Sequence, residues 1–429
     1  MLKKVIAIVL WLSVCSMARG QQDQPRFISD TQGLSFGELS RLAVSRNKDL
    51  EAARESLHQA EARLTQARLW PNPTLDISSS TDVMFANEGD SGLSVTVSQP
   101  IEFGGKRAKR ISVEEASIEV TRAQIADAER QLVTRLRKLF AEAISTASRL
   151  ELFGRLANVN EQTVNIMDVR LKAGDASRLD SQLLAAQTNQ VRTQRLVAEN
   201  QLARTILQVQ ALAGYSPGES IILKRELPVE FSEAEEVAVS KALENRPDLK
   251  AARLREAMEE AGIVLAKSEA VPNLNLSVGY GRESVATFVT GANRTFEREN
   301  VMQFGISLPL PLSNREQGNI AQAASRAKQA RAEREALEAN IRREVALAYR
   351  RYEAARRTLE MLRTGVLQPN QESLRIVQLA YSLGDMRLLD VVTQQRVVIE
   401  AETAYVDAQT EFNEALADLH ATVGDREVF

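Results

Sequence analysis

Two short turns hold the polar side chains best suited to forming ion pairs. We predict that they form a gate and a docking surface made of Gly174, Asp175, Arg178 and Asp180 in one turn and Tyr381, Gly384, Asp385, Arg387 and Asp390 in the other. Carboxylates and guanidinium groups that meet form charge-assisted hydrogen bonds, which can hold a constriction shut. The alternative is that the glycines and aspartates only shape the turn and cap the next helix.

No residue pattern predicts bond-making chemistry. The two histidines, His58 and His420, each stand alone in a helical stretch. Carboxylates occur in mixtures such as Glu333-Arg334-Glu335, which are typical of solvated helix faces. The net charge of −3 offers no basic footprint for nucleic acid. We therefore predict no enzyme, no catalytic residue, no cofactor and no metal ligand.

Long helices must position the two turns. No proline occurs between Pro100 and Pro217, and the apolar pattern breaks only at Gly174-Asp175, so a helix of roughly 68 residues and roughly 100 Å is expected over 106–173. Its seam follows a 4-3 spacing and consists of Leu132, Leu136, Leu139, Ala143, Thr146, Leu150 and Phe153. The other faces carry charges such as Arg135, Arg137, Lys138 and Glu142, which rule out a lipid-spanning helix. An ordinary bundle core is the alternative to a coiled coil.

The second half of the chain repeats the first in the same order. The segment 47–54 reappears as 245–253, Pro73-Thr74-Leu75 as Pro272-Asn273-Leu274, and Gly174-Asp175 as Gly384-Asp385. The heptad stripe recurs as Ile341, Val345, Ala348, Tyr352, Ala355, Leu359 and Leu362. A period of about 200 residues indicates a duplicated domain-sized unit rather than a solenoid.

The remaining boundaries follow from composition. Residues 1–20 read as a signal peptide, with Lys3 and Lys4 before a short apolar run. The only cysteine, Cys15, is either lipidated or removed with that segment. We expect a flexible leader at 21–34, a first repeat at 35–214, a connector at 215–235, a second repeat at 236–424 and a tail at 425–429. Ser35 with Glu38 has the spacing of a capping box that opens the first helix.

Each repeat also contains a hairpin of alternating strands. They are expected at about 73–83 and 91–101, and at about 272–282 and 301–311, with a second loop about ten residues longer. One face is apolar and the other is Ser, Thr, Asn, Gln or Gly, a pattern that places lipid outside and a lumen inside. Four strands cannot close a barrel, and bare sheet edges cannot sit in lipid. Several chains must therefore share one barrel, and three chains would give twelve strands.

The whole mature chain resembles the TolC-type outer-membrane efflux ducts. The matching features are Pro71-Asn72-Pro73-Thr74-Leu75, the duplicated unit, and the turn from Tyr381 through Gly384 to Asp390; Leu171 stands where the first turn would have its tyrosine. The stretch from Gln99 to Arg107 is most similar to members paired with heavy-metal pumps of the cobalt–zinc–cadmium type.

The resemblance implies a mainly α fold with a small β part. In it the duplicated helix–β-hairpin–long helical hairpin unit forms a trimeric twelve-stranded β-barrel continued by a periplasmic α-helical barrel. It implies an outer-membrane location, a homotrimer in lipid, and partnership with a periplasmic adaptor and an inner-membrane pump of the proton-driven resistance-nodulation-division type, with heavy-metal cations as the expected substrates. The alternatives are the exit duct of a type I protein-secretion or drug-efflux system and a soluble periplasmic coiled-coil scaffold.

Overall fold

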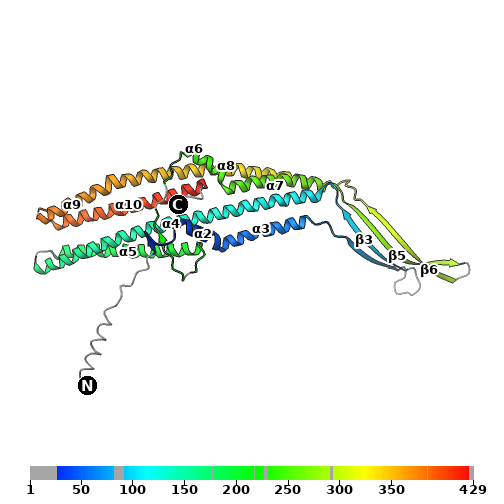
Figure 1. The fold of residues 1–429 in the computed structure, drawn as a ribbon, viewed down its shortest axis with the longest axis horizontal. Coiled ribbons are helices and arrows are strands. Elements are labelled where there is room, and N and C mark those ends of the chain that lie inside the picture. The colour runs from blue at the N-terminus through cyan, green and yellow to red at the C-terminus, as the bar shows by residue number, and fades with distance from the viewer. Residues whose placement is uncertain are drawn as a thin grey trace, which may run out of the picture. The chain divides into compact units, whose positions relative to one another are not determined.

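A computed structural model describes residues 27–81, 91–174, 177–216, 218–226, 230–289, 293–383 and 385–424. The chain forms two compact units, shown as ribbons in Figure 1. Unit 1 comprises Met1–Lys48, Gln131–Ala238 and Val345–Phe429, and unit 2 comprises Asp49–Arg130 and Val239–Glu344. The expected signal peptide, the tail, Asp175 and Gly384 lie outside the described residues.

Unit 2 combines four long helical segments, and the last seven residues of α6 (Glu235–Asn245), with one four-stranded sheet. The helices are α3 (Lys48–Ala67), the first part of α4 (Lys106–Ala173), α7 (Pro247–Glu269) and the first part of α8 (Gln317–Met361). Ion pairs join these helices, with Arg63 Nε 3.4 Å from Glu114 Oε2 between α3 and α4, and Arg334 Nε 2.6 Å from Glu256 Oε2 between α8 and α7. Arg334, which was expected on a solvated helix face, thus forms an ion pair with a neighbouring helix.

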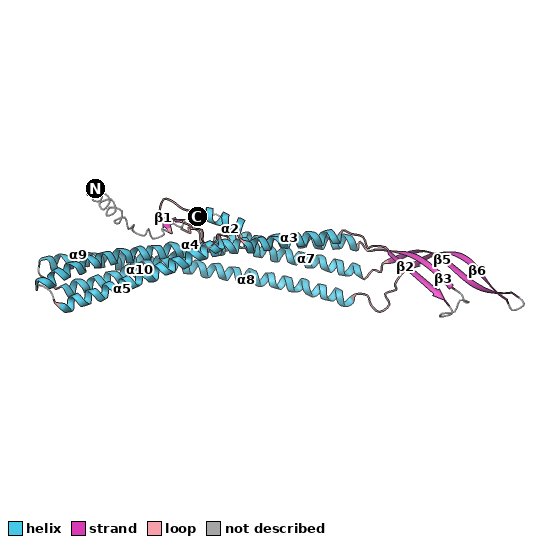
Figure 2. Ribbon diagram, turned by 90° about the horizontal axis from the view of Figure 1, so that it is seen from below, coloured by secondary structure: helices cyan, strands magenta, loops and turns pink. Residues whose placement is uncertain are grey.

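The sheet of unit 2 has the order β2-β3-β5-β6 and is antiparallel throughout (Figure 2). Its strands are β2 (Thr74–Thr81), β3 (Ser91–Ile101), β5 (Leu274–Val289) and β6 (Asn293–Ser307). The two hairpins therefore lie side by side through β3 and β5. The second hairpin differs from the expectation, because the residues assigned to a longer loop extend its strands and Leu308 and Leu310 follow the end of β6.

Unit 1 is mainly helical and has one two-stranded sheet. Its helices are α2 (Phe36–Arg46), α5 (Arg178–Leu212), η1 (Leu362–Leu367), α9 (Gln368–Leu383) and α10 (Leu388–Val423), with the first four residues of α6 and the remainders of α4 and α8. The heptad stripes supply much of the core: Leu136 and Ile341 are fully buried, the latter at the unit 2 end of its stripe, and Tyr352 packs on Phe412 with ring centroids 5.6 Å apart. Ser35 caps α2 with a capping box to Glu38, as its spacing predicts.

Two expectations about unit 1 were wrong. Arg137, assigned to a charged outer face, is only 2% exposed, because its guanidinium lies over the ring of Phe36 at 5.2 Å. The described part of the leader is ordered: β1 (Ile28–Ser29) pairs in parallel with β4 (Leu223–Lys224) of the connector. Leu223 is fully buried there, and its N–H donates to Phe27 O at 2.8 Å, which joins the connector to the leader.

None of the helices in the described part of the chain is long and apolar enough to span a bilayer.

Candidate functional site

The sheet presents one continuous apolar face. Cross-strand pairing places Ile77 opposite Val95, Val97 opposite Val278, and Val278 opposite Phe304. Side chains two residues apart share a face, so all four strands contribute to the same ladder. Phe304 is 76% exposed and Ile306 is 75% exposed, although both are large and apolar. Such a face on a soluble monomer marks a surface that contacts lipid or another protein.

The opposite face is made of small polar residues. Ser98 pairs with Ser277, Thr96 pairs with Gly279, and Ser78 Oγ lies 2.7 Å from Ser94 Oγ. A Cβ on Gly305 would approach Ser277 Oγ to 2.4 Å, so glycine allows the packing at this rung. The two faces therefore differ as lipid and water contacts would require.

A tight joint turns β3 into α4. Gly104 and Gly105 have φ of +75° and +69°, a left-handed conformation that glycine adopts without cost. Lys106 Nζ donates to Asn273 Oδ1 at 2.6 Å, which ties this joint to the start of the second hairpin. Arg110 clamps Glu102 through two hydrogen bonds of 2.6 and 2.9 Å and holds the pKa of that carboxyl below its usual range.

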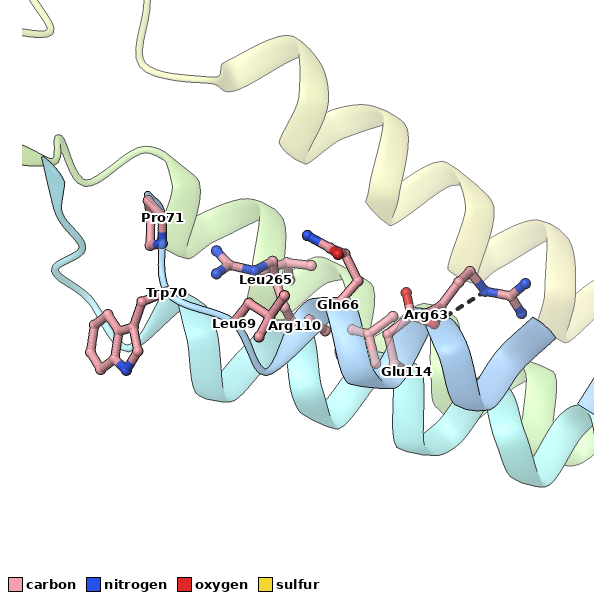
Figure 3. A pocket seen from close by; sticks show the side chains of 10 residues that line it. Arg63, Gln66, Leu69, Trp70, Pro71, Arg110, Glu114 and Leu265 are labelled. Carbon is pink, nitrogen blue, oxygen red and sulfur yellow. Dashed lines mark hydrogen bonds and ion pairs between the residues drawn. The ribbon is translucent and has the colours of Figure 1, made fainter. Parts of the chain in front are cut away.

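Beside this joint lies a depression of about 450 Å³ between α3, α4 and α7 (Figure 3). Arg63, Leu69, Pro71 and Leu265 are among its lining residues, and Trp70 is also on its edge. Trp70 is 61% exposed, and the centre of its ring lies 5.1 Å from the Arg107 guanidinium carbon, a cation–π contact. An amphipathic aromatic at the end of an apolar face is typical of a membrane interface.

The first predicted turn ends α4 and starts α5. Gly174 has φ +83°, and its N–H donates to Leu171 O at 3.2 Å. Ser177 caps α5 by accepting from the Leu179 N–H at 3.2 Å. Arg178 is the first residue of α5, and Asp180 lies in its first turn; the described residues include no ion-pair partner for either side chain.

The second predicted turn joins α9 to α10. Asp385 N–H donates to Ala380 O at 3.0 Å, which closes the end of α9. Asp390, the third residue of α10, accepts through Oδ2 from the N–H of the N-cap residue Arg387 at 3.0 Å, as the third residue of a capping box does. Both turns lie at the same end of unit 1 (Figures 1 and 2), which brings the described members of the predicted set to one place. The capping alternative accounts for the contact of Asp390 but not for Asp180.

The sequence interpretation missed three features of unit 1. Ser177 is the N-cap of α5, and its place before Arg178-Leu179-Asp180 was the available signal. Asn160 and Gln395 are both buried, and Gln395 Nε2 donates to Asn160 Oδ1 at 2.9 Å between α4 and α10. The π-helical segment η1 stands just before Pro369, the signal for a break in regular winding.

Each histidine contacts a residue of its own surroundings. His58 Nδ1 lies 3.3 Å from Glu61 Oε2 within α3, and the ring of the buried His420 is edge-on to that of Phe231, with centroids 5.4 Å apart. Within the described ranges, no three His, Cys, Asp or Glu side chains form a group that could hold a metal ion.

Comparison with known proteins identifies relatives along almost the whole chain. The family model described as outer membrane efflux protein matches residues 39–215 and 238–425. The cobalt-zinc-cadmium resistance protein CzcC of Cupriavidus metallidurans is 25% identical over 390 residues, 89% of this chain and 88% of that protein. The pyoverdine export outer membrane protein OpmQ of Pseudomonas aeruginosa is 24% identical over 420 residues, 90% of this chain and 83% of that protein.

Solved structures share the fold. A membrane protein from Pseudomonas aeruginosa superposes with a TM-score of 0.74 at 22% identity and covers 93% of this chain and 91% of its own. The open state of the MtrE outer membrane channel of Neisseria gonorrhoeae gives a TM-score of 0.70 at 19% identity, with 94% and 97% covered. These likenesses support the mainly helical fold with a small sheet.

Proposed function

The chain belongs to the outer membrane efflux protein family, and from this premise we propose that three copies form the exit duct of a tripartite efflux system. As an outer-membrane efflux channel, it offers a path across that membrane. The proposal adds the assembly, the partners and the cargo. Three four-stranded sheets would make one twelve-stranded barrel, continued by a periplasmic barrel of helices.

The two-faced sheet with open edges carries this proposal. Among the described strands, β2 and β6 each pair on one side only, so each leaves a row of unpaired backbone groups. In hydrocarbon each unsatisfied group costs several kcal/mol, so the edges must pair with something. The β6 edge of one copy meeting the β2 edge of the next satisfies both rows, and three copies close the ring.

The mass of the detergent-solubilised complex tests the assembly. We expect three times the mass of the mature chain, with heat converting the complex to single chains. A stable monomer whose sheet is closed on itself would overturn the proposal.

For the cargo we propose heavy-metal cations, passed on by a periplasmic adaptor and an inner-membrane pump of the resistance-nodulation-division type. The support is the likeness to CzcC and to the nickel and cobalt resistance protein CnrC, also of Cupriavidus metallidurans, at 23% identity over 361 residues. Passage through a water-filled lumen requires no metal ligand in the duct, because diameter and lining charge set what can pass. Selection would then reside in the pump.

Deleting the gene and measuring growth inhibition tests the cargo. Sensitivity to cobalt, zinc and cadmium salts should rise, and the intact gene should restore resistance. Unchanged metal tolerance with accumulation of a siderophore or an organic drug would instead favour the export role named for OpmQ or a drug-efflux duct.

For the turns we propose the gate and the adaptor-docking surface, formed by Gly174, Asp175, Arg178, Asp180, Tyr381, Gly384, Asp385, Arg387 and Asp390. The support is that both turns share one end of unit 1 and that, among the described residues, Arg178 and Asp180 find no ion-pair partner. Neighbouring copies would supply the missing partners, so that the bonds close the tip only in the trimer.

A further inference from the structure

Two arginines stand on the apolar face of the sheet where its hydrophobic ladder ends. Arg282 pairs across β5 and β6 with Asn300, and Ser284 pairs with Arg298. Residues two apart along a strand share a face, so these positions continue the face of Tyr280 and Met302. Arg282 and Arg298 are diagonal neighbours, a relation that sets residues about 7–8 Å apart.

The two arginines line one hollow. It has a volume of about 360 Å³, and its lining residues also include Glu283 of β5 and Ser79, Ser91 and Leu93 of the first hairpin. Both arginines are exposed. Two like charges this close repel each other, and an anion between them would relieve that repulsion. Ser79 and Ser91 provide hydroxyl groups beside the charges.

The carboxylates at the same level belong to the opposite face. Glu283 pairs directly with Glu299. A Cβ placed on Gly92 would lie 2.9 Å from Ser80 Oγ and 3.6 Å from Glu283 Cγ, so Glu283 shares the polar face with Ser80. Glu283 borders the hollow, but its register places its side chain on the face opposite to that of the two arginines.

The position of the hollow along the strands determines its depth in the membrane. The ends of the strands nearest the helices are Thr74, Ile101, Leu274 and Ser307. Arg282 follows Leu274 by eight residues and Arg298 precedes Ser307 by nine, about the number of residues that a tilted strand needs to cross a bilayer. Tyr280 Oη lies 2.9 Å from Asn300 Oδ1 at the boundary, where an amphipathic ring is expected at a lipid headgroup. With the helices in the periplasm, this boundary belongs to the outer leaflet.

We propose that Arg282 and Arg298 bind a phosphate group of an anionic outer-leaflet lipid. The inference rests on the barrel proposed above, in which the apolar face meets lipid. A planar guanidinium group matches the oxygens of phosphate in two-point hydrogen bonds. The acyl chains of the same lipid would lie along the ladder of Tyr280, Met302 and Phe304, so headgroup and tail contacts come from one continuous surface.

The test is a titration of the full-length trimer in detergent with bisphosphorylated lipid A, followed by native mass spectrometry. The double variant Arg282→Gln/Arg298→Gln should bind at least about tenfold more weakly, which corresponds to about 1.4 kcal/mol. Dephosphorylated lipid A should bind the original protein as weakly as it binds the variant. The trimer mass read in the same spectra separates a lost lipid site from a failed assembly.

Two control variants sharpen the result. Arg342→Gln/Arg343→Gln removes the same charge from the exposed surface of α8 and should leave lipid A binding unchanged. Glu283→Gln/Glu299→Gln changes charge at the same rung on the other face and should also have no effect. Equal binding by the original trimer and the Arg282/Arg298 variant, or equal loss in the α8 control, would overturn the proposal. Displacement of lipid A by comparable concentrations of inorganic phosphate would show a bare anion site and overturn the lipid assignment.

Discussion

The helical stretch between the hairpin and the predicted turn has nearly the same number of residues in the two repeats, but its winding differs. In the first, α4 runs from Lys106 to Ala173 as one helix of 68 residues. In the second, α8, η1 and α9 follow one another from Gln317 to Leu383, with a π-helical segment of six residues between the two α-helices. Pro369 lacks an N–H and its ring crowds the carbonyl of Gly365, and a π turn accommodates both defects. The duplicated unit thus keeps the number of residues in this helical stretch almost constant, although the winding changes locally.

The strand-to-helix joints differ in the same way. The first joint uses Gly104 and Gly105 at positive φ. The second has Glu316 at φ +57°, the only non-glycine with positive φ among the described residues. Its backbone N–H donates to Asn314 Oδ1 at 3.0 Å, so a local side-chain bond does what glycine does in the first repeat. The positive φ at the joint is therefore allowed by glycine in the first repeat and stabilised by a side-chain hydrogen bond in the second.

The largest expected effect tests whether both hairpins share one lipid-facing surface. Phe304→Arg in the second repeat and Val95→Arg in the first should each lower the free energy of unfolding by about 2–4 kcal/mol if they lie near the bilayer midplane. Gln303→Arg, on the other face, should cost much less. Urea titrations of the protein folded into vesicles measure all three, and equal tolerance at Phe304 and Gln303 would contradict the register.

The next effect concerns the clamp of Arg110 on Glu102 at the first joint. Glu102→Gln should lower the free energy of unfolding by about 1.5–3 kcal/mol, because it removes a charge-assisted pair whose glutamate side chain is 8% exposed. Glu114→Gln, which breaks the more exposed pair with Arg63, is the matched control and should cost about 1 kcal/mol or less.

The pH dependence gives a second check of that clamp. The bonds from Arg110 hold the pKa of Glu102 below its ordinary 4.5, so their stabilisation is complete above that value and is lost as the pH falls through the folded-state pKa. Acid titrations of the Glu102→Gln variant should lack this loss. Parallel acid profiles for the variant and the original protein would show that the clamp is not coupled to stability.

A smaller effect compares the two joints directly. Gly105→Ala should cost about 1–2 kcal/mol, since a Cβ there meets no atom within 4 Å and only the left-handed conformation is strained. Glu316→Gly removes that strain in the second repeat and should cost less than Gly105→Ala or even stabilise the chain. Thermal unfolding measures both, and a larger loss for Glu316→Gly would mean that its side-chain bond to Asn319 outweighs the strain.

Patterns that repeat along the chain predicted most of this architecture. The alternation of apolar and polar residues predicted that Leu276, Val278, Phe304 and Ile306 share one face. The strand register shows that this apolar face continues across all four strands. Burial of Arg137 and ordering of the leader depend on partners distant in sequence, Phe36 and Leu223, which no local pattern reveals. The extended second hairpin escaped prediction because its outer residues, such as Arg298 and Glu299, are charged and lack the apolar alternation.

The last comparison sets the two turns against each other. Asp390 accepts a hydrogen bond from the N–H of Arg387, the N-cap of α10, so its removal costs about 0.5–1.5 kcal/mol whether or not it closes a gate. Asp180 has the corresponding place in α5, but there Ser177 is the cap, and the described residues include no hydrogen-bond partner for the Asp180 carboxylate. Asp180→Ala therefore separates gating from capping more cleanly than a change at Asp390.

If bonds between copies close the tip, Asp180→Ala should raise single-channel conductance in a planar bilayer without loss of thermal stability. The double variant Asp390→Ala/Tyr381→Ala should raise conductance as well, with a small loss of stability and an unchanged yield of trimer. Ser177→Ala is the control, because it removes a cap and no charge and should lower stability without changing conductance. Unchanged conductance in both aspartate variants, with the trimer intact, would leave these residues with a turn-forming role alone.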